Sequence, residues 1–199
     1  MESNSSLWAW GRNDLGQLGT SDITHRSNPT QIGINLWINI GSSGLANYAI
    51  HSNGYLYSSG YNGNGQLGTN DTVSRSSPTI VGSSLWKQIS FGYAHVSSIN
   101  SNGTLWSWGS NSYAQLGNNT TTVSFSSPVQ IGSSLWKQVS SGYWHTAAIQ
   151  SNGTLWTWGN NTCGELGTSD TFIRYSPVQI GSNLWSSVAA GFHQTMAIQ

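Results

Sequence analysis

The sequence contains very few charged residues. Asp, Glu, Lys and Arg make up 6% of its 199 residues, and six acidic residues balance six basic ones, whereas soluble domains average about 25% charged residues. A surface that binds nucleic acid needs clustered Lys and Arg, and here the six basic residues are scattered along the chain. The composition therefore excludes a nucleic-acid partner and a basic patch for acidic lipids.

Cysteine and long apolar runs are equally scarce. Cys163 is the single cysteine, so the chain cannot form an internal disulfide or a thiolate cluster for a metal. No apolar run approaches the ~18 residues of a membrane-spanning helix, and the polar residues 1–6 carry no signal-peptide pattern. We therefore expect no membrane insertion, with a location either in the cytoplasm or on the surface of a virion or cell.

Tryptophan and glycine, by contrast, are abundant, with 11 and 24 copies, and the 12% of aromatic residues argues against a disordered chain. They recur at a fixed spacing. The pattern Leu-Trp-x-Trp-Gly begins at Leu7, returns in degraded form at Leu56, and recurs at Leu105 and Leu155. Residues 1–199 are therefore expected to form one domain of four repeats, at 3–51, 52–100, 101–150 and 151–199.

Each repeat has the pattern of short β-strands. In residues 104–108, Leu105 falls on one face of a strand, and Trp106 and Trp108 fall on the other. Ser-Asn-Gly separates two apolar runs in three of the repeats, which predicts type I′ hairpin turns. Four strands in about 50 residues, without a helical period, predict an all-β fold: a β-propeller of four-stranded antiparallel blades.

The repeat resembles the one that defines the regulator of chromosome condensation family. The segments Leu-Trp-x-Trp-Gly-x-Asn, Gly-Gln-Leu-Gly, Ser-Pro-Val-Gln-Ile and Gly-Tyr-x-His-Thr-Ala-Ala-Ile carry the resemblance, which spans the whole chain. The resemblance implies that Trp-Lys-Gln-Val-Ser forms the innermost strand A of a blade and that His-Thr-Ala-Ala-Ile forms strand B. Leu-Trp-Ser-Trp is then strand C, and Pro-Val-Gln-Ile is the outer strand D.

On this assignment the chain begins with strand C of a blade and ends with strand B, so residues 7–32 and 185–199 are expected to share one blade. Ring closure removes exposed sheet edges. Three arrangements achieve it: a four-bladed ring within one chain, an eight-bladed ring from two chains, or an open arc completed by another protein. Four strands A bearing Trp, Lys, Gln and Val would be crowded around one axis, which favours the two-chain ring.

Three Asp–Arg pairs occupy the same place in three repeats. They are Asp22–Arg26, Asp71–Arg75 and Asp170–Arg174. The third repeat lacks both charges, with Thr120 or Thr121 in place of Asp and Ser124 or Phe125 in place of Arg. Their joint loss predicts an ion pair that staples the C-to-D loop, rather than a carboxylate for metal binding or acid–base catalysis.

No catalytic residue, metal site or cofactor is expected. His95 and His145 share one repeat position, which predicts structural hydrogen bonds, because a metal site needs ligands gathered in one place. Cys163 lies in a Gly-rich loop without a paired base, and hydrolase motifs are absent. The chain is therefore not expected to be an enzyme.

Four aromatic residues form the candidate binding site. Most tryptophans recur with the repeat and are expected to pack between blades, whereas Trp144 breaks the period. One hypothesis is that Trp144 forms an aromatic rim beside the channel with Tyr93, Tyr143 and Phe192, on the face of the A–B turns, and the alternative is that these rings simply pack. Exposed aromatic rings suit the recognition of a protein or a sugar.

These observations favour a non-catalytic propeller that serves as a protein-interaction platform or assembly subunit, its partner being another protein or a second copy of this chain. The alternative is a carbohydrate-binding propeller on a viral or bacterial surface, in keeping with the charge-poor composition. Guanine-nucleotide exchange on a small GTPase, which the resemblance also implies, is less favoured, because repeats of 49, 49, 50 and 49 residues leave no room for a protruding insertion.

Overall fold

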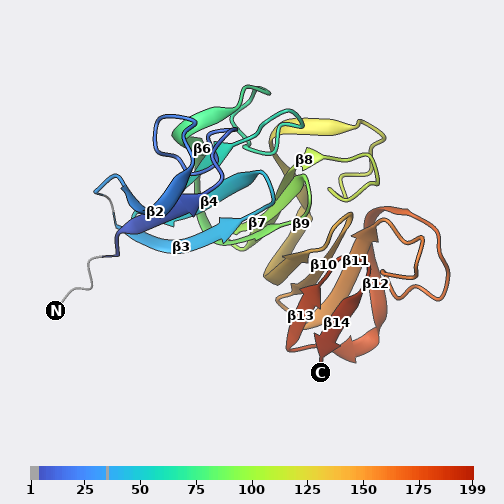
Figure 1. Ribbon diagram of the computed structural model, residues 1–199. Coiled ribbons are helices and arrows are strands. Elements are labelled where there is room, and N and C mark those ends of the chain that lie inside the picture. The colour runs from blue at the N-terminus through green and yellow to red at the C-terminus, as the bar shows by residue number, and fades with distance from the viewer. Residues whose placement is uncertain (1–4, 35) are drawn as a thin grey trace.

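The computed structural model describes residues 5–34 and 36–199, and all regular structure in them is β-strand (Figure 1). In chain order the strands are β1 (Leu7–Gly11), β2 (Arg26–Ile32), β3 (Trp37–Ser42), β4 (Ala46–His51), β5 (Tyr55–Gly60), β6 (Arg75–Phe91), β7 (His95–Asn100), β8 (Thr104–Ser110), β9 (Ser124–Ser141), β10 (His145–Gln150), β11 (Thr154–Gly159), β12 (Arg174–Leu184), β13 (Ser187–Ala190) and β14 (Thr195–Ile198). The described residues include no helix of the length and apolarity that a membrane crossing demands. The fold is all-β, as the sequence predicts.

Three complete four-stranded antiparallel blades follow one another along the chain. The first contains β3, β4, β5 and the start of β6, and the second contains the end of β6, β7, β8 and the start of β9. The third contains the end of β9, followed by β10, β11 and β12. The long strands β6 and β9 thus each supply strand D of one blade and strand A of the next, as the family resemblance implies.

The Ser-Asn-Gly turns join strands B and C, but their type differs from the prediction. A type I′ turn needs positive φ at both central residues, and in these turns only the glycines have it, at 86° in Gly54, 83° in Gly103 and 89° in Gly153. The N–H of Gly54 donates to the carbonyl of His51, so each turn is closed by its glycine and the asparagine keeps an ordinary conformation.

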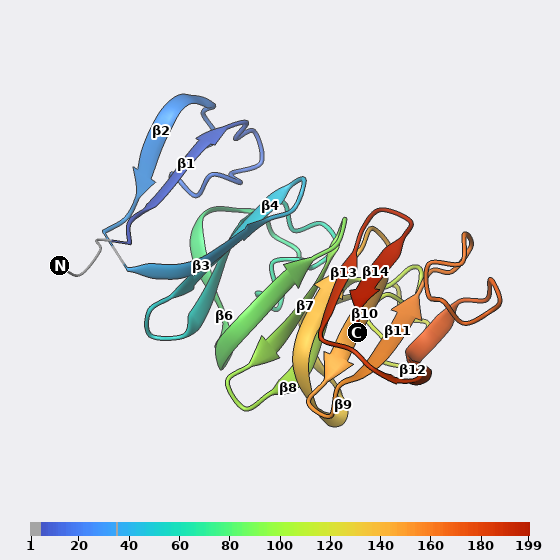
Figure 2. The same cartoon turned by 90° about the horizontal axis from the view of Figure 1, so that it is seen from below.

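The two ends of the chain hold half-blades. Strands β1 and β2 correspond to strands C and D of a blade, and β13 and β14 correspond to strands A and B. Within the described residues, β1 pairs with β2 alone and β13 with β14 alone, and the two hairpins lie at opposite ends of the row of blades (Figure 2). Of the three arrangements, the four-bladed ring closed within one chain is therefore not the one in this structure.

Glutamine side chains link the inner strands of neighbouring blades. The side chain of Gln88 bonds both backbone groups of Val139 in the next blade, with distances of 3.1 Å from Nε2 to the carbonyl and 3.3 Å from Oε1 to the N–H. Gln138 bonds Val188 in the same way. The same pair of hydrogen bonds thus links the second blade to the third and the third to the C-terminal half-blade.

The core lies between the blades and is centred on the second tryptophan of strand C. Trp108 and Trp158 are fully buried, and their indole N–H groups donate to backbone carbonyls of the preceding blade, Gln66 at 2.8 Å and Gln115 at 2.9 Å. Gly117 lies against this ring, because a Cβ there would come within 2.6 Å of Trp158 Nε1. The Gly-Gln-Leu-Gly motif is therefore the surface on which the next blade docks.

Buried histidines connect the blades a second time. The hydroxyl of Thr146 donates to the carbonyl of Gln115, which leaves its oxygen free to accept from His95 Nε2 at 3.1 Å. His145 contacts Thr195 in the same arrangement, at 3.0 Å. Burial lowers the pKa of His95 to about 3 and that of His145 to about 4, so both rings are neutral in the folded protein at neutral pH.

These histidines predict an acid-sensitive fold. Because their folded pKa values lie below the ordinary value of 6.5, the unfolded chain binds more protons below that pH. Their contribution to the free energy of unfolding is complete above pH 6.5 and is lost as the pH falls toward 4 and then 3. By pH 5 the loss is about 2 kcal/mol for each histidine. Urea unfolding followed against pH measures this loss.

The matched variant is His95→Gln with His145→Gln, since Gln194 occupies the same position in the last repeat. The variant is expected to unfold with a much flatter pH dependence between neutral pH and about pH 5, above the range where carboxylates titrate. An equal slope in both proteins would show that the histidines do not cause the acid sensitivity.

Candidate functional site

The aromatic residues singled out by the sequence lie together on the face of the A–B turns. Tyr93, Tyr143 and Phe192 come from the turns of successive blades, with ring centroids 4.6 Å apart for Tyr93–Tyr143 and 4.0 Å apart for Tyr143–Phe192. Backbone hydrogen bonds run beneath the rings, from Tyr93 N–H to the Tyr143 carbonyl and from Tyr143 N–H to the Gly191 carbonyl. Tyr93 is 50% exposed and Phe192 is 55% exposed, so the row presents its rings to solvent.

Trp144 extends this row outward. Its ring meets Tyr143 edge to face at 4.6 Å and stacks on Tyr113 at 4.4 Å, with 24° between the planes. Trp144 is half-buried, because Tyr113, from the C-to-D loop of the preceding blade, covers one side. Tyr113 was not predicted from the sequence. Its departure from the repeat, where other copies have Leu15, Asn64 or Cys163, is the signal that marks it.

An open cavity of about 380 Å³ lies beside the aromatic row. Its walls are the A–B turns of four successive blades, at residues 42–44, 91–93, 141–143 and 190–192. These residues contribute hydroxyls, glycines and aromatic rings, and none of them is an acid, a histidine or a lysine. The cavity lining therefore offers aromatic rings and hydroxyl groups to a ligand or partner.

The three Asp–Arg pairs predicted in the C-to-D loops are in contact. Each joins an Arg Nη2 to an Asp Oδ2 at 2.5 Å, in Asp22–Arg26, Asp71–Arg75 and Asp170–Arg174. The other oxygen of each carboxylate accepts from the loop itself, as Asp71 Oδ1 does from the N–H of Val73. This backbone bond, more than the arginine, lowers the pKa of Asp71. The carboxylates are thus parts of the loop's own structure.

The third repeat shows which residues replace the pair. Thr120 takes the aspartate position, since its hydroxyl accepts from the N–H of Thr122 at 3.3 Å. Phe125 takes the arginine position, because it faces Gly109 as Arg75 faces Gly60. The extra residue of this repeat therefore lies between them.

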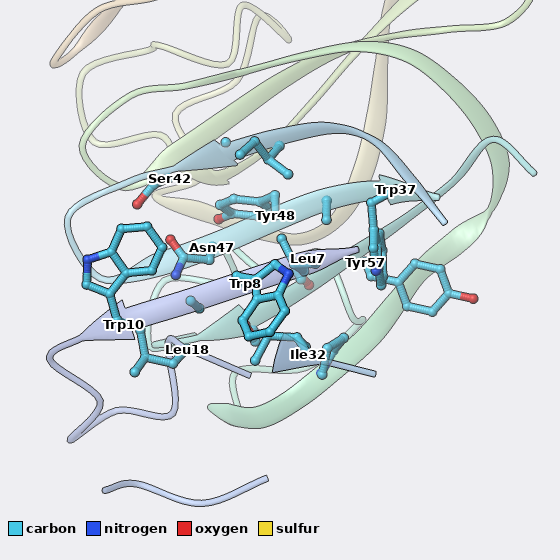
Figure 3. Close-up of a pocket in the computed structure, with 17 residues that line it drawn as sticks. Leu7, Trp8, Trp10, Leu18, Ile32, Trp37, Ser42, Asn47, Tyr48 and Tyr57 are labelled. Atoms are coloured by element: carbon cyan, nitrogen blue, oxygen red, sulfur yellow. The ribbon is translucent and has the colours of Figure 1, made fainter. Parts of the chain in front are cut away.

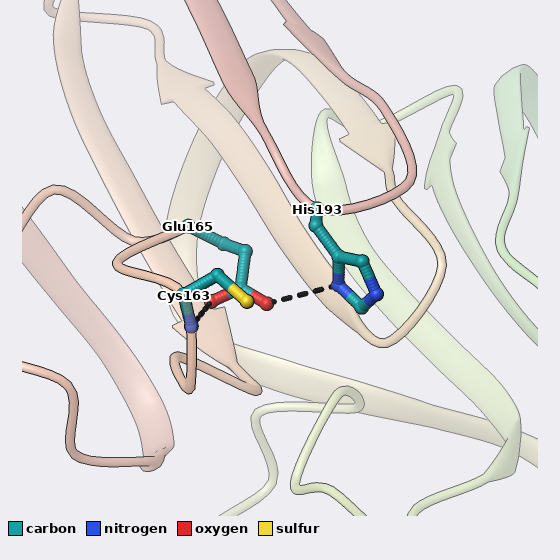
Figure 4. A group of neighbouring side chains, drawn as sticks. All are labelled: Cys163, Glu165 and His193. Atoms are coloured by element: carbon teal, nitrogen blue, oxygen red, sulfur yellow. Dashed lines mark hydrogen bonds and ion pairs between the residues drawn. The ribbon is translucent and has the colours of Figure 1, made fainter.

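A cluster that the sequence analysis did not predict joins the last blade to the C-terminal hairpin. Glu165 Oε1 lies 3.1 Å from His193 Nδ1, and Glu165 Oε2 accepts from the N–H of Cys163 at 2.8 Å (Figure 4). The Glu165 side chain is 0% exposed. Burial raises the pKa of the Glu165 carboxyl, but hydrogen bonds from its surroundings, including the Cys163 N–H, His193 and Asn160, outweigh it and lower that pKa. Cys163, expected to lie apart from any base, is therefore beside a histidine and an ionised carboxylate.

A second cavity lies where the N-terminal half-blade meets the first complete blade. It has a volume of about 270 Å³, and its lining is mainly apolar (Figure 3). Trp8 and Trp10 of β1 line one side, and Ile40 and Tyr48 line the other. Trp10 is 60% exposed and Ile40 is 66% exposed, although their counterparts in later repeats, Trp108 and Val139, are buried. The half-blade thus leaves a core surface uncovered.

Comparison with models of known protein families identifies the family of the repeat. A model described as the regulator of chromosome condensation (RCC1) repeat matches residues 4–38, 53–99, 102–149 and 152–198, and a second model of that description matches 86–115 and 136–165. The chain belongs to the RCC1 repeat family. A search of curated proteins found no match.

Solved structures of similar fold are about twice as long. Human WBSCR16 superposes with a TM-score of 0.85 and 22% identity, over 98% of this chain and 54% of its own. Prp20p from Saccharomyces cerevisiae superposes with a TM-score of 0.85 and 20% identity, over 96% of this chain and 51% of its own. Yeast RCC1 (Prp20) bound to Kap60 superposes with a TM-score of 0.81 and 18% identity, over 98% of this chain and 50% of its own. This chain thus spans about half of each of these RCC1-like propellers, and the likeness shows the fold alone.

The geometry predicts that replacing Trp108 or Trp144 by alanine lowers the free energy of unfolding by different amounts. Trp108→Ala removes a fully buried ring and its hydrogen bond to Gln66, and should lower the free energy of unfolding by about 3–5 kcal/mol. Trp144→Ala removes a half-buried ring stacked on Tyr113, and should cost clearly less, because less apolar surface is lost and the stacking itself contributes only about 0.5–1.5 kcal/mol. Urea unfolding compares the two variants, and equal losses would make Trp144 a core residue rather than part of a binding surface.

Proposed function

We propose that this chain is a non-catalytic propeller subunit that works through protein–protein contact, and that one partner is a second copy of the chain. The observation that carries this proposal is the complementarity of the two half-blades. Strands β1 and β2 lack strands A and B, and β13 and β14 lack strands C and D. Two copies exchanging these ends would form two complete blades, giving a ring of eight.

The register of the complete blades supports a pairing of β14 of one copy with β1 of another. Tyr48 faces Ser58 and Ala147 faces Thr157. At the same repeat position, Met196 would face Ala9. A large side chain would again meet a small one, as in Tyr48–Ser58, which is the packing that cross-strand pairs favour.

The exposed apolar residues of the two halves also match. In the complete blades Ile149 faces Leu155 and both are buried. Their counterparts Ile198 and Leu7 would meet between copies, and Ile198 is 65% exposed in the single chain. Burying such a side chain contributes about 1.5–3 kcal/mol, so this pair would add to the apolar driving force of the exchange.

Trp10 would gain a hydrogen bond at the same time. Trp158 donates to the carbonyl of Gln115 in the preceding blade. Trp10 is the counterpart of Trp158 in the first repeat, and Glu165 is the counterpart of Gln115 in the last repeat. The exposed indole of Trp10 would therefore reach the Glu165 carbonyl of the second copy. That carbonyl already accepts from the Thr195 hydroxyl, as the Gln115 carbonyl accepts from Thr146 in a complete blade.

Mass in solution, measured by light scattering over a range of concentrations, tests the assembly. The wild-type chain is expected to have the mass of two copies. Met196→Lys places a charge in the shared blade and should give the mass of one folded copy, with an unchanged β-sheet circular dichroism spectrum. Phe172→Lys, at a residue 72% exposed in a C-to-D loop, is the control and should retain two copies.

A wild-type mass of one chain at every concentration, or a Met196→Lys protein that still dimerises, would contradict self-assembly. The open ends would then await another protein with RCC1-type strands, the third arrangement that the sequence allows.

The aromatic row and its cavity offer a second surface for a different protein. The yeast relatives are described with protein partners, Gsp1p and histones for Prp20p and Kap60 for yeast RCC1. In this chain each acidic side chain within the described residues pairs with an arginine or histidine, which disfavours a strongly basic partner. Exposed aromatic anchors favour a partner with an apolar contact patch, and neither nucleotide exchange nor catalysis is needed for that role.

A glycan array separates this proposal from the lectin alternative, which the aromatic rings beside a cavity rich in serine and glycine also suit. The protein-contact proposal expects no retained glycan, because no array of charged or amide side chains lines the described cavity to fix sugar hydroxyls. Retention by the wild-type protein that is lost in Trp144→Ala would favour the lectin function instead. Tyr175→Ala, a half-exposed aromatic in β12, is the control.

A further inference from the structure

We propose that Cys163, Glu165 and His193 form a binding site for a zinc ion. One ligand atom from each of the three side chains lies within 4.8 Å of the other two. Thiolate, carboxylate and imidazole are all ligands of zinc in proteins, and calcium or magnesium sites use oxygen alone. The site lies at the seam between the last complete blade and the C-terminal half-blade, apart from the aromatic row's cavity.

The three residues depart together from the repeat. Glu165 stands where the other repeats have glutamine, at Gln17, Gln66 and Gln115. These glutamines accept from the backbone N–H two residues earlier, as Gln115 does from Tyr113 at 2.8 Å, and Glu165 keeps this bond with Cys163. The loop therefore does not need the carboxylate, whose added charge requires another explanation.

The partner positions change as well. In the preceding blade Tyr113 stacks on Trp144, and at the same two repeat positions Cys163 stands beside His193. An apolar contact is thus replaced by two side chains that bind metals. One carboxylate oxygen of Glu165 faces the His193 ring, and the other faces the backbone N–H of Cys163 (Figure 4).

The distances suit a tetrahedral ion after a small adjustment. Two nitrogen or oxygen ligands of tetrahedral zinc lie about 3.3 Å apart, and Glu165 Oε1 and His193 Nδ1 are separated by 3.1 Å. Cys163 is exposed, so its side chain is free to rotate toward the ion. Solvent would supply the fourth ligand.

Surrounding groups hold the ligands in place. Asn160, which is 1% exposed, donates from Nδ2 to Glu165 Oε1 at 2.9 Å, and its own Oδ1 is buried without a hydrogen-bond partner. The His193 ring packs against Phe192 at 4.5 Å and Trp144 at 5.9 Å. Such outer contacts are usual around metal ligands and typically change affinity by about 10–100-fold when removed.

Zinc at this site would tie the C-terminal hairpin to the last complete blade. Cys163 and Glu165 lie in the loop between β11 and β12, and His193 lies in the turn between β13 and β14. The ion would therefore stabilise a hairpin that carries only half of a blade. All three ligands belong to one chain, so the site can form with or without the exchange of half-blades.

Isothermal titration with Zn²⁺ tests the site, with Co²⁺ as a spectroscopic probe of the thiolate ligand. The wild-type protein is expected to bind one Zn²⁺ per chain. Its Co²⁺ complex should show a thiolate-to-metal charge-transfer band in the near ultraviolet. Zinc should also slow amide hydrogen exchange in β13 and β14.

Variants that copy residues from the other repeats provide matched controls that fold. Glu165→Gln restores the residue of the other three copies and should weaken Zn²⁺ binding more than about tenfold. Cys163→Ser should abolish the charge-transfer band. Cys163→Tyr with His193→Trp, which copies the Tyr113–Trp144 contact, should bind no metal. His51→Gln, in a different blade, should bind as the wild type does.

Absence of Zn²⁺ binding by the wild-type protein would overturn the proposal. Binding that Glu165→Gln and Cys163→Ser leave unchanged would overturn it equally, because the ion would then lie elsewhere. The same titration on Met196→Lys keeps the result separate from the state of assembly.

Discussion

The structure depends on one hydrogen bond that recurs between blades. The carbonyl at the glutamine of the Gly-Gln-Leu-Gly motif accepts from the indole N–H of the next blade's tryptophan, in Gln66–Trp108 and again in Gln115–Trp158. Because both groups are buried, either one left alone would incur a desolvation cost of about 1–3 kcal/mol. The bond joins the docking motif of one blade to the buried tryptophan of the next, and apolar residues of neighbouring blades pack around that tryptophan.

Much of the fold could be predicted from the sequence because each strand and turn pattern recurs in several repeats. A strand suggested weakly by one repeat is supported by its copies, and an ion pair such as Asp71–Arg75 is identified by its joint absence from the third repeat. The curvature of the arc is different in kind. The curvature depends on contacts such as Gln88–Val139, between residues 51 positions apart. An alternating apolar pattern predicts strands, but it does not predict the angle between neighbouring blades.

The candidate site divides in the same way. Tyr93, Tyr143, Trp144 and Phe192 could be identified because they stand at turns, where an aromatic ring serves no strand. Glu165 and His193 are 28 positions apart and lie in a loop and a turn that belong to different sheets. No local sequence pattern therefore predicts their contact. Its signal was the replacement of a repeated glutamine by glutamate. In a repeat protein the informative positions for function are those at which the copies disagree.

The long strands β6 and β9, each shared by two blades, bear on how such a chain changes in length. The repeating unit of the sequence runs from strand C to strand B, so it is out of phase with the blade. A duplicated or deleted unit contributes half of one blade and half of the next, and the cut ends on either side rejoin as a whole blade. A change of one unit in copy number therefore changes the row by one whole blade.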